Sequence, residues 1–221
     1  MTRIRISGFM KRYVSVNYNT EEEMIELIER IRDRIDYINF KLDVKSKNLR
    51  ITLYGPKDLV KEALADINEI VRSVRGILYP DIHGLFSYSV KEIMSFIRGV
   101  AIPLNLLMYA LEFRGYRAVI DGGYIKTDAK LEEVASLAAS ISDAYDEMKY
   151  LAMTPTCKRL VALYAALRDI SIGEAIEDLE ALKLIKRENE KYMLARELNQ
   201  SLKILREYMT SSGVPHESSR A

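Results

Sequence analysis

The chain has 221 residues, of which 48% are hydrophobic and 29% are charged, and its formal net charge is +1. This length allows one large domain or two to three small ones, and the composition suits a globular protein that buries a core. The near-zero net charge argues against a protein that is coated in basic surface. Cys157 is the one cysteine of the sequence, which excludes an intrachain disulfide, and we expect it to be a small packing residue.

No apolar run approaches the roughly 18 residues that a membrane span needs. The N-terminal segment alternates in polarity instead of forming the apolar region of a signal peptide, so we expect a cytoplasmic protein without membrane contact. Sequence motifs of nucleotide-phosphate, dinucleotide, zinc-protease and serine-hydrolase sites are absent. Two histidines and one cysteine do not make a typical zinc site. We therefore predict no metal, cofactor or catalytic residue, and we expect His83 to lie in a loop.

Residues 1–79 predict a small α+β domain. Ile4 and Ile6 alternate with polar residues, and Val14, Val16 and Tyr18 do so again, which predicts two strands in succession. Both segments precede the first helical pattern of the chain. The domain is therefore expected to begin with two strands.

Helix-start signals and a hairpin follow. Thr20 is the expected N-cap of a helix over about residues 21–35, with Glu23 as its capping-box partner. On either side of "KSKN", apolar residues alternate with polar ones, which predicts a hairpin over residues 40–53. A second helix is expected to start at Pro56 and to end at Gly76.

The predicted order over residues 2–76 is β-β-α-β-β-α, which indicates a KH-like or ferredoxin-like α/β sandwich. Such folds are common among RNA-binding modules, although this chain lacks the G-x-x-G loop of KH domains and the aromatic motifs of the RNA-recognition motif. The side chains expected on the exposed sheet face are Tyr13, Ser15, Asn17, Arg50, Thr52 and Tyr54. They suit RNA stacking, but tyrosine and threonine are also ordinary strand formers.

The remaining sequence predicts an internal repeat with an offset of 68 residues. Apolar positions of residues 93–141 fall on apolar positions of residues 161–209, including Leu111 on Leu179 and Tyr124 on Tyr192. Each copy predicts a helix, a helix, a hairpin and a helix. This is the outline of a degenerate winged helix, with unit boundaries expected at 88–150 and 154–210 and a disordered tail at 211–221.

Caps and turns support the repeat. In the first copy, Ser89 caps a helix that Gly99 ends, and Pro103 starts the next helix, which Gly115 ends. The hairpin turn of this copy is "DGG". In the second copy, the caps are Thr154 before Pro155, and Ser171 with Glu174, and "KRENEK" is a weaker turn signal because it lacks glycine.

The helices that would enter a DNA major groove in a winged helix have the wrong side chains for that role. The first, "IPLNLLMYALEF", is almost wholly apolar, and the second, "SIGEAIEDLEAL", carries four carboxylates. Base reading requires Arg, Lys, Asn or Gln beside phosphate-contacting cations. Sequence-specific DNA binding is therefore not expected.

The stretches "SVNYNTEEEMIELIERI", "ITLYGPKDLVKEALADINEIVRSVR" and "LVALYAALRDISIGEAIEDLEALKLIKRENEKYML" together resemble an uncharacterised archaeal family, a domain of unknown function. The resemblance covers roughly residues 2–209. It implies archaeal origin, and it assigns no activity and no functional residue.

The leading hypothesis is a non-enzymatic protein that binds structured RNA or a ribonucleoprotein through backbone contacts. The expected phosphate contacts are Lys11, Arg12, Lys45, Lys47 and Arg50, followed by Lys186, Arg187 and Lys191. The alternative is a protein-interaction adaptor or homodimer, which would use Leu107 and Met108 of the apolar helix 102–113. A carboxylate-based enzyme is a third interpretation, but the acidic clusters stand at helix starts, where the helix dipole favours acids.

Overall fold

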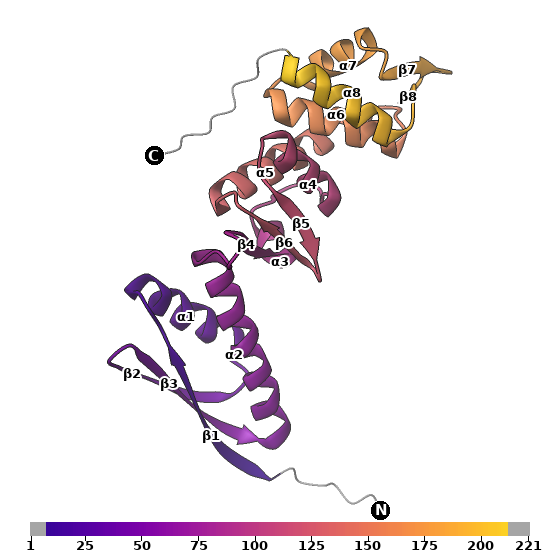
Figure 1. Cartoon of the computed structure of the whole chain (residues 1–221). Coiled ribbons are helices and arrows are strands. Elements are labelled where there is room, and N and C mark those ends of the chain that lie inside the picture. Colours follow the sequence, from indigo (N-terminus) through magenta and orange to yellow (C-terminus); the bar gives the residue numbers. More distant parts are fainter. Residues whose placement is uncertain (1–7, 212–221) are drawn as a thin grey trace, which may run out of the picture. The chain divides into compact units, whose positions relative to one another are not determined.

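The computed structural model describes residues 8–211 and divides into two compact units, Met1–Asp81 and Ile82–Ala221 (Figure 1). Helices and small antiparallel sheets are combined in both, so the predicted α+β class is confirmed. Ile4 and Ile6, and the predicted disordered tail beyond Ser211, lie outside the described residues.

The first unit has the described order β-α-β-β-α. Its elements are β1 (Phe9–Asn17), α1 (Glu21–Arg34), β2 (Asn39–Lys45), β3 (Asn48–Pro56) and α2 (Lys57–Leu78). The strands form one antiparallel sheet in the order β1-β3-β2. Strand β1 contains Val14 and Val16 of the second predicted strand and starts earlier than predicted, at Phe9. The predicted strand at Ile4 and Ile6 falls outside the described residues.

Both helices of this unit pack on the same face of the sheet (Figure 1). The central strand β3 turns Leu49, Ile51 and Leu53 toward the helices, and all three are fully buried. Leu27 and Ile31 of α1 meet them together with apolar side chains of α2. Because side chains alternate along a strand, the same register sends the intervening residues to the opposite face.

Glu23 joins the first turn of α1 to the end of α2. Thr20 caps α1 as predicted, accepting a hydrogen bond from the Glu23 amide. The Glu23 carboxylate, however, does not close the predicted capping box. It accepts from the Asn19 amide at 2.8 Å, from Arg75 Nε at 3.0 Å and from the Tyr79 hydroxyl at 3.0 Å.

Burial of the Glu23 carboxylate raises its pKa, but the hydrogen bonds and the Arg75 charge outweigh this effect and hold the pKa below its ordinary value. These contacts also explain why α2 continues through Gly76, where the sequence predicted its end. Continuation to Leu78 lets Leu78 pack against the core and carries the Tyr79 hydroxyl to Glu23.

The second unit contains both copies of the predicted repeat. The first copy comprises β4 (Phe86–Ser89), α3 (Val90–Ser95), α4 (Leu104–Phe113), β5 (Ala118–Asp121), β6 (Tyr124–Thr127) and α5 (Leu131–Glu147). The second comprises α6 (Pro155–Arg168), α7 (Ile172–Ala181), β7 (Ile185–Glu188), β8 (Lys191–Leu194) and α8 (Leu198–Ser211). Each copy has the predicted succession of two helices, a hairpin and a helix.

The first copy differs from the prediction in two places. Strand β4 pairs with β6 and makes a three-stranded sheet in the order β4-β6-β5. Helix α3 ends at Ser95, before the predicted stop at Gly99. Gly99 instead lies close to Ser142 of α5, where an added Cβ would be 3.0 Å from the Ser142 hydroxyl oxygen. Close packing therefore explains this glycine better than helix termination does.

The repeat keeps its offset of 68 residues through α4 and α7 and then shortens by one residue. Gly115 and Lys183 both follow their helices with positive φ, 90° and 56°. The Tyr116 amide donates to the Leu111 carbonyl, as the Leu184 amide donates to that of Leu179. Strands β6 and β8 start only 67 residues apart, so the predicted pairing of Tyr124 with Tyr192 is wrong by one position.

The two hairpins nevertheless use the same turn. Gly122 and Gly123 have φ of 54° and 86°, and Asn189 and Glu190 have φ of 48° and 62°. Each pair joins two antiparallel strands as a two-residue loop, and positive φ at both positions matches the right-handed twist of the strands. The second hairpin therefore holds two non-glycine residues in a left-handed conformation.

Helix α6 is the centre of the second unit. Every residue from Leu160 to Leu167 is buried, and α4, α5, α7 and α8 all pack against this helix. Cys157 lies in the same helix and is fully buried, in agreement with a packing role. Burial raises the pKa of its thiol to about 11, and the nearby Glu180 charge adds to this effect. The thiol is therefore protonated at neutral pH.

We predict that Glu23→Gln lowers the free energy of unfolding by about 1–3 kcal/mol at neutral pH, because a charged acceptor of three hydrogen bonds is lost. The folded-state pKa of Glu23 is depressed, so its contribution is present above the unfolded value and lost as pH falls through the folded value. The difference between wild type and variant should therefore vanish well below pH 4.5. Urea unfolding, followed by circular dichroism at several pH values, measures the difference in the free energy of unfolding between wild type and variant.

Glu69→Gln is the matched control, since Glu69 is on α2 but its ion pair with Arg34, at 3.4 Å, is exposed. This control should change stability by no more than a few tenths of a kcal/mol. Equal losses in both variants, or a Glu23 effect that persists in acid, would contradict the role given to Glu23.

We also predict that Glu190→Gly raises the melting temperature, because glycine adopts a φ of 62° without the penalty of about 1 kcal/mol that an L side chain meets there. Lys191→Gly, one residue later in β8, should lower the melting temperature instead. Differential scanning calorimetry of the full chain distinguishes the two. A lower melting temperature for Glu190→Gly would show that the turn is not strained.

Candidate nucleic-acid interface

The sheet of the first unit has one face that no helix of that unit covers. We call this the open sheet face, and it carries the side chains that alternate with the core residues. They are Phe9, Lys11, Tyr13, Ser15 and Asn17 of β1, Asn39, Lys41, Asp43 and Lys45 of β2, and Asn48, Arg50, Thr52 and Tyr54 of β3. The six side chains that the sequence predicted for the exposed face all belong to this set.

Three aromatic rings gather at one end of the open sheet face, and we call this the aromatic end. Phe9, Tyr13 and Tyr54 are 64%, 61% and 50% exposed. The rings of Phe9 and Tyr54 lie 5.7 Å apart between centroids. Lys11 stands between Phe9 and Tyr13 along β1 and opposite Tyr54 on β3, and its Nζ lies 5.3 Å from the centre of the Tyr13 ring.

The other end of the open sheet face is basic. Arg50 lies on the central strand between Ser15 and Asp43, and Lys45 lies opposite Asn48. Lys41 Nζ is 2.7 Å from Asp43 Oδ1, and this hydrogen bond lowers the pKa of the Asp43 carboxyl. Asp43 is the one acid of the set, whereas Lys11, Lys41, Lys45 and Arg50 are cations, so the face is positively charged at neutral pH. We call Lys45 and Arg50, together with Lys41, which lies level with Thr52 and Tyr13, the basic end.

The predicted phosphate contacts of this unit separate into three groups. Lys11, Lys45 and Arg50 share the open sheet face, as the hypothesis requires. Arg12 pairs with the buried Leu53 and alternates with Met10 and Val14, so it lies on the side of the sheet that the helices cover. Lys47 occupies the β2–β3 turn with a φ of 59°.

Phe9 and Lys41 also lie on the open sheet face, although the sequence prediction named neither of them. Both could have been found from the period-two alternation, because Phe9 is two residues before Lys11 and Lys41 is four before Lys45. The strand predicted from Val14, Val16 and Tyr18 starts earlier in the structure, at Phe9, so only its N-terminal part was not recognised. Phe9 adds a third ring, and Lys41 adds a cation that Asp43 partly neutralises.

The predicted cations of the second hairpin do not converge on one face. Lys186 and Lys191 lie on the same side of the β7–β8 ribbon, where Lys186 pairs with Glu188 at 2.9 Å. Arg187 lies on the opposite side, 5.6 Å from the centre of the Tyr192 ring. In the first hairpin, Lys126 pairs with Asp121. Both hairpins therefore combine their cations with local carboxylates.

The proposed interface residues of helix α4 have a different role. Leu107 is fully buried and Met108 is half-buried, because α4 packs against β5, α5 and α6 within the unit. The apolar character of this helix is thus explained by the core of the second unit. Leu107 is not available at the surface for the predicted adaptor or homodimer contact.

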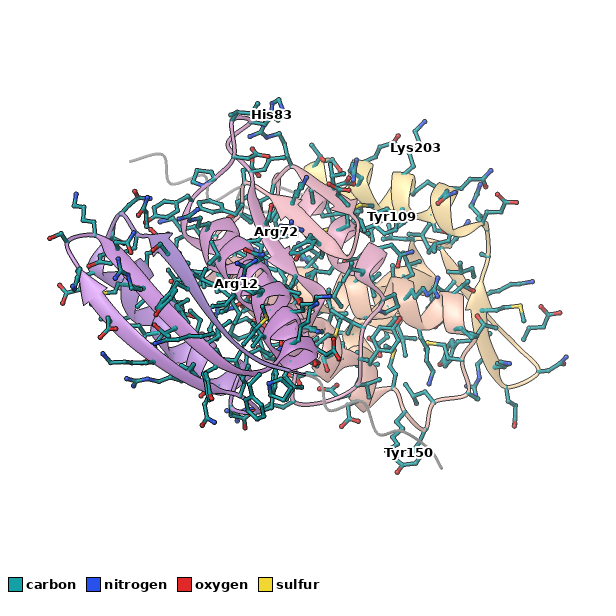
Figure 2. The ribbon with its side chains drawn as sticks, turned by 90° about the horizontal axis from the view of Figure 1, so that it is seen from below. Arg12, Arg72, His83, Tyr109, Tyr150 and Lys203 are labelled. Carbon is teal, nitrogen blue, oxygen red and sulfur yellow. The ribbon has the colours of Figure 1, made fainter. Side chains whose placement is uncertain are left out.

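Among residues 8–211, no group of three His, Cys, Asp or Glu side chains is placed to hold a metal ion. Within the same residues, none of the helices has the length and apolarity needed to cross a membrane. His83 stands in the loop before β4, as predicted, and its carbonyl accepts from Arg117 Nη2 at 3.1 Å (Figure 2).

Comparison with known proteins gives a family assignment. Residues 16–203 match the family described as "uncharacterized protein conserved in archaea" (DUF2067). No curated protein and no solved structure matches the chain. The match runs from the last two residues of β1 through the first copy of the repeat and ends within α8 of the second copy. Because it extends over most of the sequence, the chain belongs to this family of uncharacterized proteins conserved in archaea.

Proposed function

We propose that this protein binds RNA through the open sheet face of its first unit, without catalysing a reaction. The observation that carries the proposal is the presence of three exposed aromatic rings and four cations on one uncovered sheet face. RNA-binding sheets use these two kinds of side chain, since the rings stack on bases and the cations neutralise phosphates.

The fold is compatible with this function. An antiparallel sheet in the order β1-β3-β2 with two helices on one face suits the KH-like interpretation of the sequence. KH domains clamp the RNA backbone with a G-x-x-G loop, which this chain lacks. In our proposal, the phosphate contacts therefore come from the sheet, with Lys11, Lys45 and Arg50 as the principal contacts and Lys41 as an addition.

The second unit is proposed to be a scaffold whose hairpins contribute at most secondary contacts. Its helix α7, which would face DNA in a winged helix, carries Glu174, Glu177, Asp178 and Glu180. Carboxylates on that face would repel phosphates. The adaptor or homodimer alternative depended on an exposed apolar α4, and the burial of Leu107 removes that basis.

If phosphates contact the basic end, replacing Lys45 and Arg50 with glutamine should weaken RNA binding and make it less sensitive to salt. The slope of log affinity against log salt should fall by about one unit for each cation removed. Fluorescence anisotropy of a labelled RNA of random sequence, titrated at several salt concentrations, measures both. An unchanged slope in the double variant would place the phosphate contacts elsewhere.

Lys11 and Arg12 provide a matched pair, because they are adjacent in β1 but lie on opposite faces of the sheet. We expect Lys11→Gln to weaken RNA binding several-fold and Arg12→Gln to leave it unchanged, although both variants lose one positive charge. The same anisotropy titration measures them. Equal effects would mean that only the net charge of the unit matters, and a larger effect at Arg12 would exclude the open sheet face as the binding surface.

A further inference from the structure

We infer that the ligand of the open sheet face is unpaired RNA, with bases stacked on Tyr13, Tyr54 and Phe9 and the neighbouring phosphates on Lys11 and the basic end. This inference rests on the proposed RNA-binding function and specifies its substrate class. The inference depends on three features of the described residues. They are the hydroxyls of Tyr13 and Tyr54, which make no hydrogen bond there, the spacing of the rings, and the position of Lys11.

Tyr13 and Tyr54 differ from the tyrosines that stabilise the fold. The hydroxyls of Tyr37, Tyr79, Tyr88 and Tyr164 each donate to a carboxylate or carbonyl oxygen. Within the described residues, the hydroxyls of Tyr13 and Tyr54 make no hydrogen bond, and half or more of each side chain is exposed. Neither ring contributes to the core. Neither core packing nor a hydroxyl hydrogen bond within the described residues therefore explains a tyrosine at these two positions.

Phe9 supports the same conclusion. Its ring is 64% exposed to water, although it carries no polar group that water would hydrate. Among residues 8–211, its one aromatic contact is with Tyr54, at a centroid separation of 5.7 Å and an interplanar angle of 36°. The contact joins the two rings into a continuous apolar platform. Such a platform on a basic face favours a flat, partly apolar ligand that also carries negative charge, which describes a nucleotide.

The spacing of the rings selects unpaired nucleotides. Tyr54 is opposite Lys11 and Tyr13 is opposite Thr52, so the two tyrosines occupy diagonal positions on neighbouring strands. Diagonal side chains are roughly 7–8 Å apart. Consecutive bases of a duplex strand are only about 3.4 Å apart along the axis. Two consecutive bases can therefore stack on Tyr13 and Tyr54 only after they have separated from each other, which a paired strand does not allow.

Lys11 occupies the position that a phosphate between the two bases would require. It lies between Phe9 and Tyr13 on β1 and opposite Tyr54, at the centre of the aromatic end. Its ammonium group now lies over the Tyr13 ring, 5.3 Å from the centroid. A base that stacked on Tyr13 would displace the ammonium group from the ring, and the ammonium would then be free to pair with the adjoining phosphate.

The absence of tryptophan from the sequence allows a direct test. Tyr13→Trp and Tyr54→Trp each introduce a unique fluorophore that remains able to stack. Tyr150→Trp is the control, since Tyr150 lies in the loop after α5 of the second unit, is 91% exposed and has a lysine, Lys149, near its ring (Figure 2). The probes are a single-stranded RNA of about ten nucleotides and the duplex of the same sequence.

We expect the single strand to quench the emission of Tyr13→Trp and Tyr54→Trp and to leave that of Tyr150→Trp unchanged. The duplex should quench none of them. In parallel, Tyr13→Val should weaken binding of the single strand about tenfold, because one stacked base is lost, whereas Tyr13→Phe should bind like wild type. Valine maintains the strand propensity of the site, so loss of folding does not account for the difference.

Failure of the inference and failure of the proposed function give different results. If RNA binds with a salt dependence that requires Lys45 and Arg50, but no fluorophore is quenched and Tyr13→Val binds normally, stacking is overturned while the RNA-binding proposal stands. Equal affinity for strand and duplex also overturns the inference. If neither RNA binds, both proposals fail. If a DNA strand of the same sequence binds more tightly than the RNA, the ligand is DNA and the inference of an RNA ligand is overturned.

Discussion

The packing of two helices on one face of a three-stranded sheet is the constraint on which the first unit and its candidate site depend. Leu49, Ile51 and Leu53 of the central strand must face α1 and α2 to be removed from water. Because side chains alternate along a strand, Arg50, Thr52 and Tyr54 are then turned to the open face. A shift of one residue in strand register would exchange the two sets, so the hydrophobic core also determines which side chains are available to a ligand.

In the second unit, no face is left open around the central helix α6, because other helices surround it. A helix that is buried from Leu160 to Leu167 needs neighbours on every face, and α4, α5, α7 and α8 provide them. The same requirement explains the apolar sequence of α4. The cations of the two hairpins stand beside carboxylates, as in the Lys126–Asp121 and Lys186–Glu188 pairs. These ion pairs reduce the positive charge that the two hairpins present.

A protein with a net charge of +1 can still present a basic face, because the distribution of charge matters more than its sum. On the helix side of the first unit, cations such as Arg34 and Arg75 are paired with Asp66, Glu69 and Glu23. On the open sheet face, the one carboxylate, Asp43, is bonded to Lys41. Lys11 stands among the exposed aromatic rings and Arg50 lies on the same face, which is the combination on which the proposed RNA contact rests.

The sequence by itself determined what depends on neighbouring residues. The helix caps at Thr20, Thr154 and Ser171 and the alternating exposure of β1 and β3 were all predictable, because a cap or a strand period involves residues close in the chain. Tertiary structure alone decided the pairing of β4 with β6, the contact of Glu23 with Arg75 and the burial of Leu107. Each of these depends on segments far apart in sequence, whose mutual packing no local pattern encodes.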